Sequence, residues 1–204
     1  MERVLFIGKI VSTKDPLKQG RVQVELRNFP ETTTLPWLRM VYPYASKEAG
    51  FVFLPEEGDQ VAVLAGIPGH VESMIVLGYF YNATNTPGYD NADGDNKTKQ
   101  IVTRGGNQVI FSDESGKESI TVQTKDGKLS MVMDQSGPSL TVESKDTITV
   151  KATGDLTVEA KNITVKGSTN ITVEAGSACK VKGANINVEA SGNCVIKGAS
   201  VAIN

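Results

Sequence analysis

The 204-residue sequence predicts an all-β protein with two unlike regions. Residues 1–82 contain short segments of alternating apolar and polar residues separated by Gly and Pro, and residues 148–204 contain a second alternation that repeats every seven or eight residues. No segment of typical helix length has helical periodicity. We therefore expect a small barrel or sandwich followed by a repetitive β-structure whose units need stacked neighbours.

Composition narrows the class of partner. The net charge is −2, from 21 basic and 23 acidic residues, so no general field attracts nucleic acid or an anionic membrane. No apolar run approaches the roughly 18 residues of a membrane span, and Met1 is followed by Glu2 and Arg3 rather than a signal-peptide pattern. We expect a chain synthesised in the cytoplasm, and its charge favours a protein partner or none.

The first region contains five predicted short strands, a number typical of a small barrel. They are Val4–Val11, Arg21–Leu26, Leu38–Tyr42, Gln60–Leu64 and Met74–Phe80.

Residues 83–100 are polar and contain Pro87, so we interpret them as a linker. Residues 101–138 are expected to lead into the repeats, with one strand before a turn at Asp113–Lys117 and another at Ser119–Gln123.

We call residues 139–204 the needle. From residue 148 its repeats begin with phrases such as ITVK and LTVE, in which the first and third positions are apolar and are predicted to point inward. Pairs such as Thr153-Gly154 suit the corners between strands. The predicted needle core is Ile148, Val150, Leu156, Val158, Ile163, Val165, Ile171, Val173, Cys179, Val181, Ile186, Val188, Cys194 and Ile196.

Strands of about four residues supply only two inward side chains each, so one strand cannot fill a core. Three strands meeting in a triangular section close it, either as a single-chain solenoid or as three intertwined chains. A solenoid usually has longer coils and a cap, and Val201–Asn204 does not resemble one. We favour the intertwined homotrimer.

The fourth position of the repeat alternates in sign without exception. The residues are Lys151, Glu159, Lys166, Glu174, Lys182, Glu189 and Lys197. One interpretation is a solvated face, because exposed ion pairs contribute little. The other is that stacked strands place unlike charges opposite one another and so disfavour a slip in register.

Cys179 and Cys194 occupy the same first position in two repeats. We interpret both as small inward hydrophobes rather than as a disulfide or a metal site.

A set of phrases along the chain resembles the central spike proteins of contractile injection systems, namely the phage baseplate assembly protein V group and the type VI secretion VgrG proteins. Gly105–Phe111 and Asp113 resemble the segment that opens the spike helix in VgrG. In the first region the matching positions are Asp15, Pro16, Gly20, Arg21, Val22, Trp37, Arg39, Gly58, Asp59, Gly78 and Asn82.

This resemblance implies an all-β fold with an N-terminal OB-fold barrel (residues 1–82) followed by an intertwined trimeric three-sided β-helix. It also implies a structural, membrane-piercing spike at the tip of a contractile tail tube, without enzymatic activity or a cofactor. Such a spike is assembled in the baseplate of a phage tail, tail-like particle or secretion apparatus, and contacts the target envelope on firing.

The departures from the family define the expected partners. The barrel pattern starts within ten residues of Met1, so we expect a separate tail hub at the barrel end. Residues 83–100 are too short for a lysozyme domain, and His70 is the single histidine, so a His-X-His metal apex is not expected. A separate PAAR-repeat tip protein is then expected to dock on Val201, Ala202, Ile203 and Asn204.

Other functions are less well supported by the residues. A trimeric tail-fibre or adhesin shaft with a receptor-binding head is the alternative function. Nucleic-acid binding is not expected, because few basic residues accompany the aromatic ones, which we expect to pack inside the barrel or against subunits or the hub. These aromatic residues are Trp37, Tyr42, Tyr44, Phe51 and Phe53.

Two polar motifs have simple interpretations. His70 follows Pro68-Gly69 and is expected to be a loop residue, with Glu72 and Ser73 adjacent only in sequence. Residues Asp90, Asp93 and Asp95 resemble a calcium loop but lack its later bidentate Glu, so we expect a solvated linker.

Overall fold

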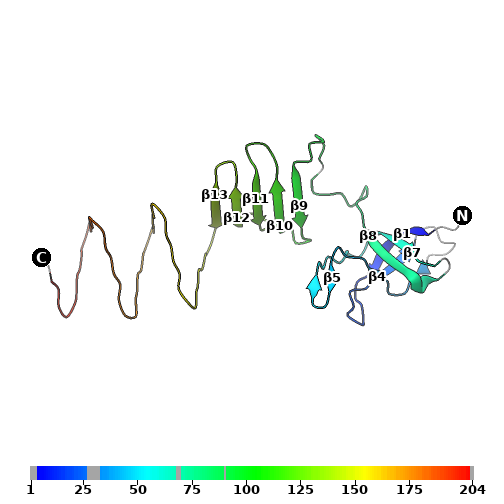
Figure 1. Ribbon diagram of the computed structural model, residues 1–204, viewed down its shortest axis with the longest axis horizontal. Helices are drawn as coiled ribbons and strands as arrows, with labels where there is room; N and C mark the ends of the chain where they lie inside the picture. The colour runs from blue at the N-terminus through cyan, green and yellow to red at the C-terminus, as the bar shows by residue number, and fades with distance from the viewer. Residues whose placement is uncertain (1–3, 27–32, 68–69, 90, 203–204) are drawn as a thin grey trace. The chain divides into compact units, whose positions relative to one another are not determined.

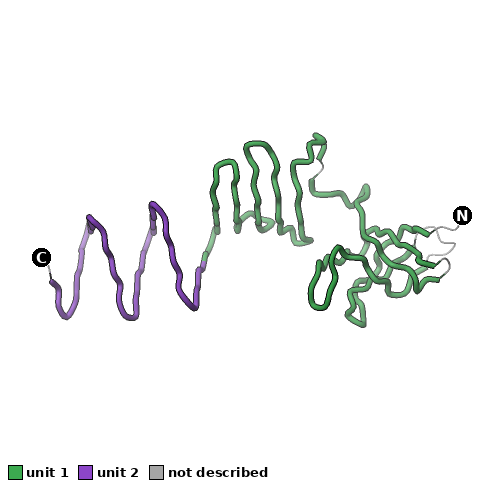
Figure 2. Tube along the Cα trace, in the orientation of Figure 1, with its two compact units in different colours: residues 1–148 green, residues 149–204 purple. Residues whose placement is uncertain are grey.

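The computed structural model describes residues 4–26, 33–67, 70–89 and 91–202. Across these residues the structure is all-β, apart from one 3-10 turn at Val71–Ser73. It divides into two compact units, residues 1–148 and residues 149–204 (Figure 2). In the described part of the chain no helix has the length and apolar character needed to cross a bilayer.

The N-terminal domain is one curled sheet with the strand order β3-β2-β1-β7-β8-β4. Its strands are β1 (Leu5–Ser12), β2 (Gln23–Leu26), β3 (Thr33–Thr34), β4 (Arg39–Met40), β7 (Gln60–Ala65) and β8 (Met74–Tyr79). All pairs are antiparallel except β4 with β8.

A bridge between Val22 and Leu38 closes this sheet into a barrel. Val22 lies just before β2 and Leu38 just before β4, near opposite ends of the strand order. The Val22 N–H donates to the Leu38 carbonyl at 3.0 Å, and the Leu38 N–H donates to the Val22 carbonyl at 2.8 Å. Because these bonds join the two sides of the sheet, fewer unpaired edge groups remain.

The barrel interior is aliphatic. Alternate residues of each strand point inward, as β7 shows, where half-buried and fully buried residues follow one another in turn. Phe6 and Met40 pack against this core from partly buried positions. The buried residues are Ile10, Val22, Val24, Leu26, Leu35, Leu38, Val61, Val63, Ala65, Met74 and Val76.

The aromatic residues do not form the barrel core, which contradicts one part of the expectation, while their packing against neighbouring subunits or the hub stays a prediction. Tyr44, Phe51 and Phe53 are exposed, while Trp37 and Tyr42 are half-buried. Tyr44 and Phe51 flank a small hairpin of β5 (Ala45–Ser46) and β6 (Ala49–Gly50), which projects these side chains outside the aliphatic core.

A second sheet follows the barrel as a five-stranded antiparallel meander, visible in Figure 1. Its strands are β9 (Thr98–Val102), β10 (Gln108–Ser112), β11 (Ser119–Gln123), β12 (Leu129–Asp134) and β13 (Ser139–Ser144). Gly116, with a φ of 75°, occupies the turn between β10 and β11, where a left-handed conformation favours glycine.

Residues 149–202 form an open coil. Its successive turns leave a gap in Figure 1, and no strand is assigned to these residues. No backbone–backbone hydrogen bond is found between residues 149 and 202. The repeats are therefore extended segments without a pairing partner in their own chain.

The strands predicted for the first region and the strand Ser119–Gln123 agree with those of the structure. The repeats differ, since no strand is assigned to residues 149–202 of the single chain. The meander is also longer than expected, because β12 was not predicted and β13 lies in the range assigned to the needle. β3 and the β5–β6 hairpin were not predicted, since two-residue strands carry almost no periodic signal. β9 begins at Thr98, inside the polar run, because its polar residues pair with β10 rather than enter a core.

The barrel predicts one sharp test of packing. A Cβ added to Gly8 would lie 2.2 Å from Val24 Cγ1 and 3.2 Å from the Glu25 carbonyl oxygen, whereas a Cβ at Gly78 meets nothing within 4 Å. We expect Gly8→Ala to destabilise the barrel by about 1–3 kcal/mol and Gly78→Ala to have little effect. Urea unfolding followed by the fluorescence of Trp37, the single tryptophan, measures both. Equal shifts in the two variants would contradict this packing.

Candidate assembly interface

One face of the meander is a continuous apolar surface. The strand register places Ile101, Val109, Val122, Met131 and Val142 in one row across all five strands. A second row on the same face contains Phe111, Ile120, Met133 and Leu140. Cross-strand partners lie on the same side of a sheet, so both rows form a single patch, which we call the meander face.

This patch has no cover within its own chain. Its largest side chains are exposed to between 41% (Phe111) and 63% (Leu140). The opposite face carries mainly polar residues such as Gln108 and Thr121, with Val102, Ile110 and Val132 as exceptions. An uncovered apolar face on a single-layer sheet marks a surface for another protein chain.

The needle presents a second uncovered surface. The predicted needle core residues are all exposed in the isolated chain, with Ile148 at 55% and Val173 at 74%. Unpaired strand backbone and exposed apolar side chains occur together over the same residues. Strands from another chain could supply both the missing backbone partners and the missing cover for these side chains.

The remaining predicted needle sites are also exposed. Cys179 and Cys194 are free thiols, and their inward orientation stays a prediction because only neighbouring chains define an interior. Val201 and Ala202 are exposed, while Ile203 and Asn204 lie outside the described residues.

Asp15 and Arg21 form the best-defined polar cluster of the barrel. Arg21 Nη2 lies 2.6 Å from Asp15 Oδ1, and Arg21 Nε donates to Oδ2 at 3.1 Å. The backbone N–H groups of Leu17, Gln19 and Arg21 also donate to this carboxylate. Only 4% of the Asp15 side chain is exposed, so the cluster organises the loop that carries Pro16 and Gly20.

These contacts determine the protonation of Asp15. The hydrogen-bonded Arg21 guanidinium holds the pKa of the carboxyl far below its ordinary value, against the opposing effect of desolvation. The three backbone donors lower the pKa further.

A second group of family-motif residues joins the β7 turn to the segment after β8. The Gly58 N–H donates to the Ile10 carbonyl at 2.8 Å, with φ at 102° for Gly58. Asn85 Nδ2 donates to Asp59 Oδ1 at 3.0 Å, and the Asn85 N–H donates to Asn82 Oδ1 at 2.9 Å. These residues therefore act in barrel closure and turn formation.

Arg21, Trp37 and Arg39 are brought together around a shallow hollow of about 380 Å³. Leu38, Ile75 and Glu72 are among the other residues that line it. Gly78 does not line this hollow and is the next-to-last residue of β8.

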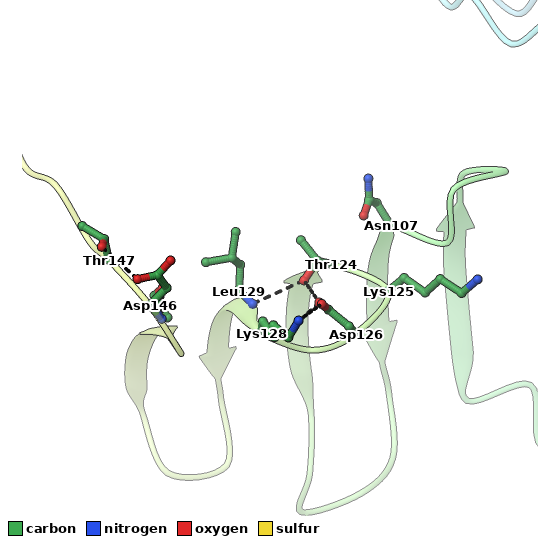
Figure 3. Close-up of a pocket in the computed structure, with 9 residues that line it drawn as sticks. Asn107, Thr124, Lys125, Asp126, Lys128, Leu129, Asp146 and Thr147 are labelled. Atoms are coloured by element: carbon green, nitrogen blue, oxygen red, sulfur yellow. Dashed lines mark hydrogen bonds and ion pairs between the residues drawn. The ribbon is translucent and has the colours of Figure 1, made fainter.

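A hollow of about 610 Å³ lies at one end of the meander (Figure 3). Asp126 there accepts hydrogen bonds from the Thr124 hydroxyl at 2.8 Å and the Lys128 N–H at 3.2 Å, and its pKa falls to about 2 chiefly through Thr124. Lys128 Nζ lies 3.1 Å from the same carboxylate. The polar groups of Thr124, Asp126 and Lys128 thus bind one another within a single turn.

The linker carboxylates face a lysine. Lys97 Nζ lies 2.5 Å from Asp95 Oδ2 and 3.7 Å from Asp93 Oδ2, and Asp95 is the main cause of a raised Lys97 pKa. Asp90 lies outside the described residues. Among the residues described, no group of three or more His, Cys, Asp or Glu side chains is arranged to hold a metal ion.

Ser73 binds backbone atoms rather than an imidazole. Its hydroxyl donates to the His70 carbonyl at 2.7 Å and accepts the Ile67 N–H at 2.8 Å. His70 itself is exposed at the start of the 3-10 turn, which places it in a loop.

Comparison with known families defines the class of the barrel. Residues 6–81 match the type VI secretion system/phage-baseplate injector OB domain. The first region is therefore an OB domain of this injector family, and the predicted OB fold is confirmed.

Two relatives from Vibrio cholerae serotype O1 extend the likeness to VgrG-type spike proteins. The chain is 32% identical over 90 residues to the actin cross-linking toxin VgrG1, and 30% identical over 95 residues to the type VI secretion system spike protein VgrG3. These matches cover 41% and 44% of this chain but only 8% and 9% of the relatives. The resemblance to VgrG-like spikes, predicted from the sequence, is confirmed.

Sequence analysis missed the meander face. The signal was present, since Ile120-Val122, Leu129-Met131-Met133 and Leu140-Val142 alternate with polar residues. What the sequence lacked was the strand register, which alone places these residues in two continuous rows.

The Asp15 cluster predicts a specific pH dependence. The folded-state pKa lies below the unfolded value of about 3.9, so the carboxylate stabilises the barrel fully above that pH and loses its effect as the pH falls below it. We expect Asp15→Asn to lower the urea midpoint by a constant amount between pH 5 and 8, and by progressively less below about pH 4.

Asp113→Asn is the control, because that carboxylate is 69% exposed and lies 3.7 Å from its partner Lys99. A difference between wild type and Asp15→Asn that grew on acidification would contradict the role assigned to this cluster.

Proposed function

We propose that this protein is a structural spike of a contractile injection machine, built as a homotrimer of OB barrels that continue into one intertwined needle. The observation that carries the proposal is the unpaired needle: residues 149–202 have extended backbone without intrachain pairing and apolar side chains without cover. The injector OB domain supplies the functional context.

The physical demand on such a spike is resistance to axial force. In an intertwined needle, every strand pairs with strands of other chains, so many ladder hydrogen bonds must break together before one chain moves. The predicted needle core would then form a dry interior along the axis. The meander face would form the first part of the same interior, because it too is apolar and open.

The finer proposal names the neighbours of the spike. A tail hub protein binds the barrel end, where Tyr44, Phe51 and Phe53 are exposed. A PAAR-repeat tip protein binds the needle end through the region of Val201 and Ala202, which are both exposed. The assembled trimer lies in a baseplate and moves toward the target envelope on firing.

The proposed role is mechanical rather than enzymatic. The polar clusters described above are satisfied within turns and loops, and the similarity to VgrG1 and VgrG3 supports a spike. A tail-fibre or adhesin shaft would need a receptor-binding head, whereas the domain found here is an injector OB domain.

Two adjacent substitutions in β11 test the trimer. Val122 lies in the meander face opposite Val109 and Met131, and Thr121 points to the other side of the sheet. We expect Val122→Glu to abolish the trimer, since a carboxylate would be buried without a partner, and Thr121→Glu to leave it intact.

Native mass measurement gives the result directly. The proposal requires a wild-type particle of three times 21.8 kDa that persists in Thr121→Glu. A wild-type monomer of 21.8 kDa would falsify the intertwined needle.

A further inference from the structure

The alternating charges of the needle have no ionic partner within their own chain. Of the ion pairs found among the described residues, none includes a residue beyond Lys128. One side-chain hydrogen bond reaches this set, from Asn187 Nδ2 to Glu189 Oε1 at 2.7 Å. The charges at the fourth positions are therefore available to other chains.

The open coil determines which repeats meet. Successive turns of one chain make no backbone hydrogen bonds to each other, and Figure 1 shows the space between them. Suppose that three chains fill a three-sided prism and each repeat spans one side. Consider one side of this prism, and number the repeats along each chain. If the first chain contributes repeat 1 to this side, the second chain contributes repeat 2 above it and the third chain contributes repeat 3. The first chain then comes back to the same side with its repeat 4.

Neighbours on each side of the prism are thus consecutive repeats from different chains. All strands on one side run in the same direction, because every chain winds with the same hand. Their fourth positions therefore stack above one another. Since the sign alternates between consecutive repeats, every Glu of the series lies between two Lys, and every Lys between the two ends of the series lies between two Glu.

We propose that this alternation is a register code by which the chain accepts aligned second and third copies of itself and disfavours copies displaced by one repeat. The proposal rests on the intertwined homotrimer proposed above. A slip of one chain by one repeat would place Lys against Lys and Glu against Glu along its whole length. Like charges directly opposite each other are unfavourable in a sheet, so the slipped assembly is disfavoured.

The corners between strands show the same two-repeat period. Gly follows Lys166, Lys182 and Lys197, whereas Ala follows Glu159, Glu174 and Glu189; Lys151, followed by Ala152, is the exception. A Cβ at Gly167 would lie 2.6 Å from the Asn170 carbonyl oxygen, and at Gly183 and Gly198 the closest carbonyl oxygen is 3.1 Å away.

The corners with little room for a side chain therefore follow three of the four repeats that end in Lys. A one-repeat slip would mismatch the corners as well as the charges. A solvated face, by contrast, requires charge but no particular order of sign along the chain. The order and its match to the corners favour a role in registration.

Three full-length variants separate order from net charge. The all-Lys chain carries Glu159→Lys, Glu174→Lys and Glu189→Lys, and the all-Glu chain carries Glu at the four Lys positions. The exchanged chain swaps all seven charges and so keeps their alternation. Because each substitution changes the charge by two, the all-Lys chain has a net charge of +4 and the exchanged chain −4, from −2 in the wild type.

Each chain is unfolded in denaturant and refolded at low salt, and the trimer fraction is measured by native mass. We expect the all-Lys and all-Glu chains to give several-fold less trimer than wild type, and the exchanged chain to match wild type. Refolding at about 1 M salt should restore both defective chains, because screening then acts within about 3 Å. A mixture of the all-Lys and all-Glu chains should recover mixed trimers at low salt.

The outcomes separate this inference from the trimer itself. If wild type, all-Lys and exchanged chains form equal amounts of trimer at low salt, the register code is wrong and the trimer stands. If the exchanged chain fails as the all-Lys chain does, alternation is not the determinant and the code is again wrong. If wild type refolds only to monomer, the trimer and the code both fall.

Discussion

Backbone pairing is the constraint on which the rest of this molecule depends. A strand is stable only when its N–H and C=O groups have partners, and in residues 149–202 the chain provides none of its own. The barrel solves the same problem internally, by closing its sheet through Val22 and Leu38. The needle repeats have no such internal solution, and in the proposed trimer other copies of the chain would supply the missing partners.

The meander of β9–β13 stands between these two solutions. Its backbone is paired within the chain, strand by strand, but its apolar face is not covered. The barrel thus lacks nothing within its own chain, and the meander lacks only cover for its apolar side chains. The needle repeats lack both side-chain cover and backbone hydrogen-bond partners. Such a gradient suits stepwise assembly, because a folded barrel and a paired sheet exist before the needle strands have to find one another.

The sequence predicted much of this architecture because the relevant signals are local. Alternation located β1, β7, β8 and β11 to within one or two residues, and the repeat marked the needle. The short hairpin after Tyr42 and the outward position of Phe51 were beyond its reach, because local apolar character does not show on which side of a barrel wall a residue lies. The meander face required a register between strands, which is a property of pairs.

The residues predicted to be functional fall into two groups, those whose contacts lie within the chain and those whose role depends on other chains. Asp15, Gly58 and Asp59 were identified by resemblance, but their contacts show that they shape loops and close the barrel. The inward orientation of the needle core residues and the docking role of the last residues stay predictions. A single chain encloses no interior in this region and carries no docked partner.

The open coil has a consequence for inheritance. In the proposed trimer, three chains wound around one another could not exchange a member without being unthreaded, so each finished spike would keep the three copies with which it formed. In a cell that makes wild-type and defective chains in equal amounts, random choice leaves only one spike in eight free of defective copies. A defect in the needle would therefore behave as dominant, even though the wild-type gene is present and fully expressed.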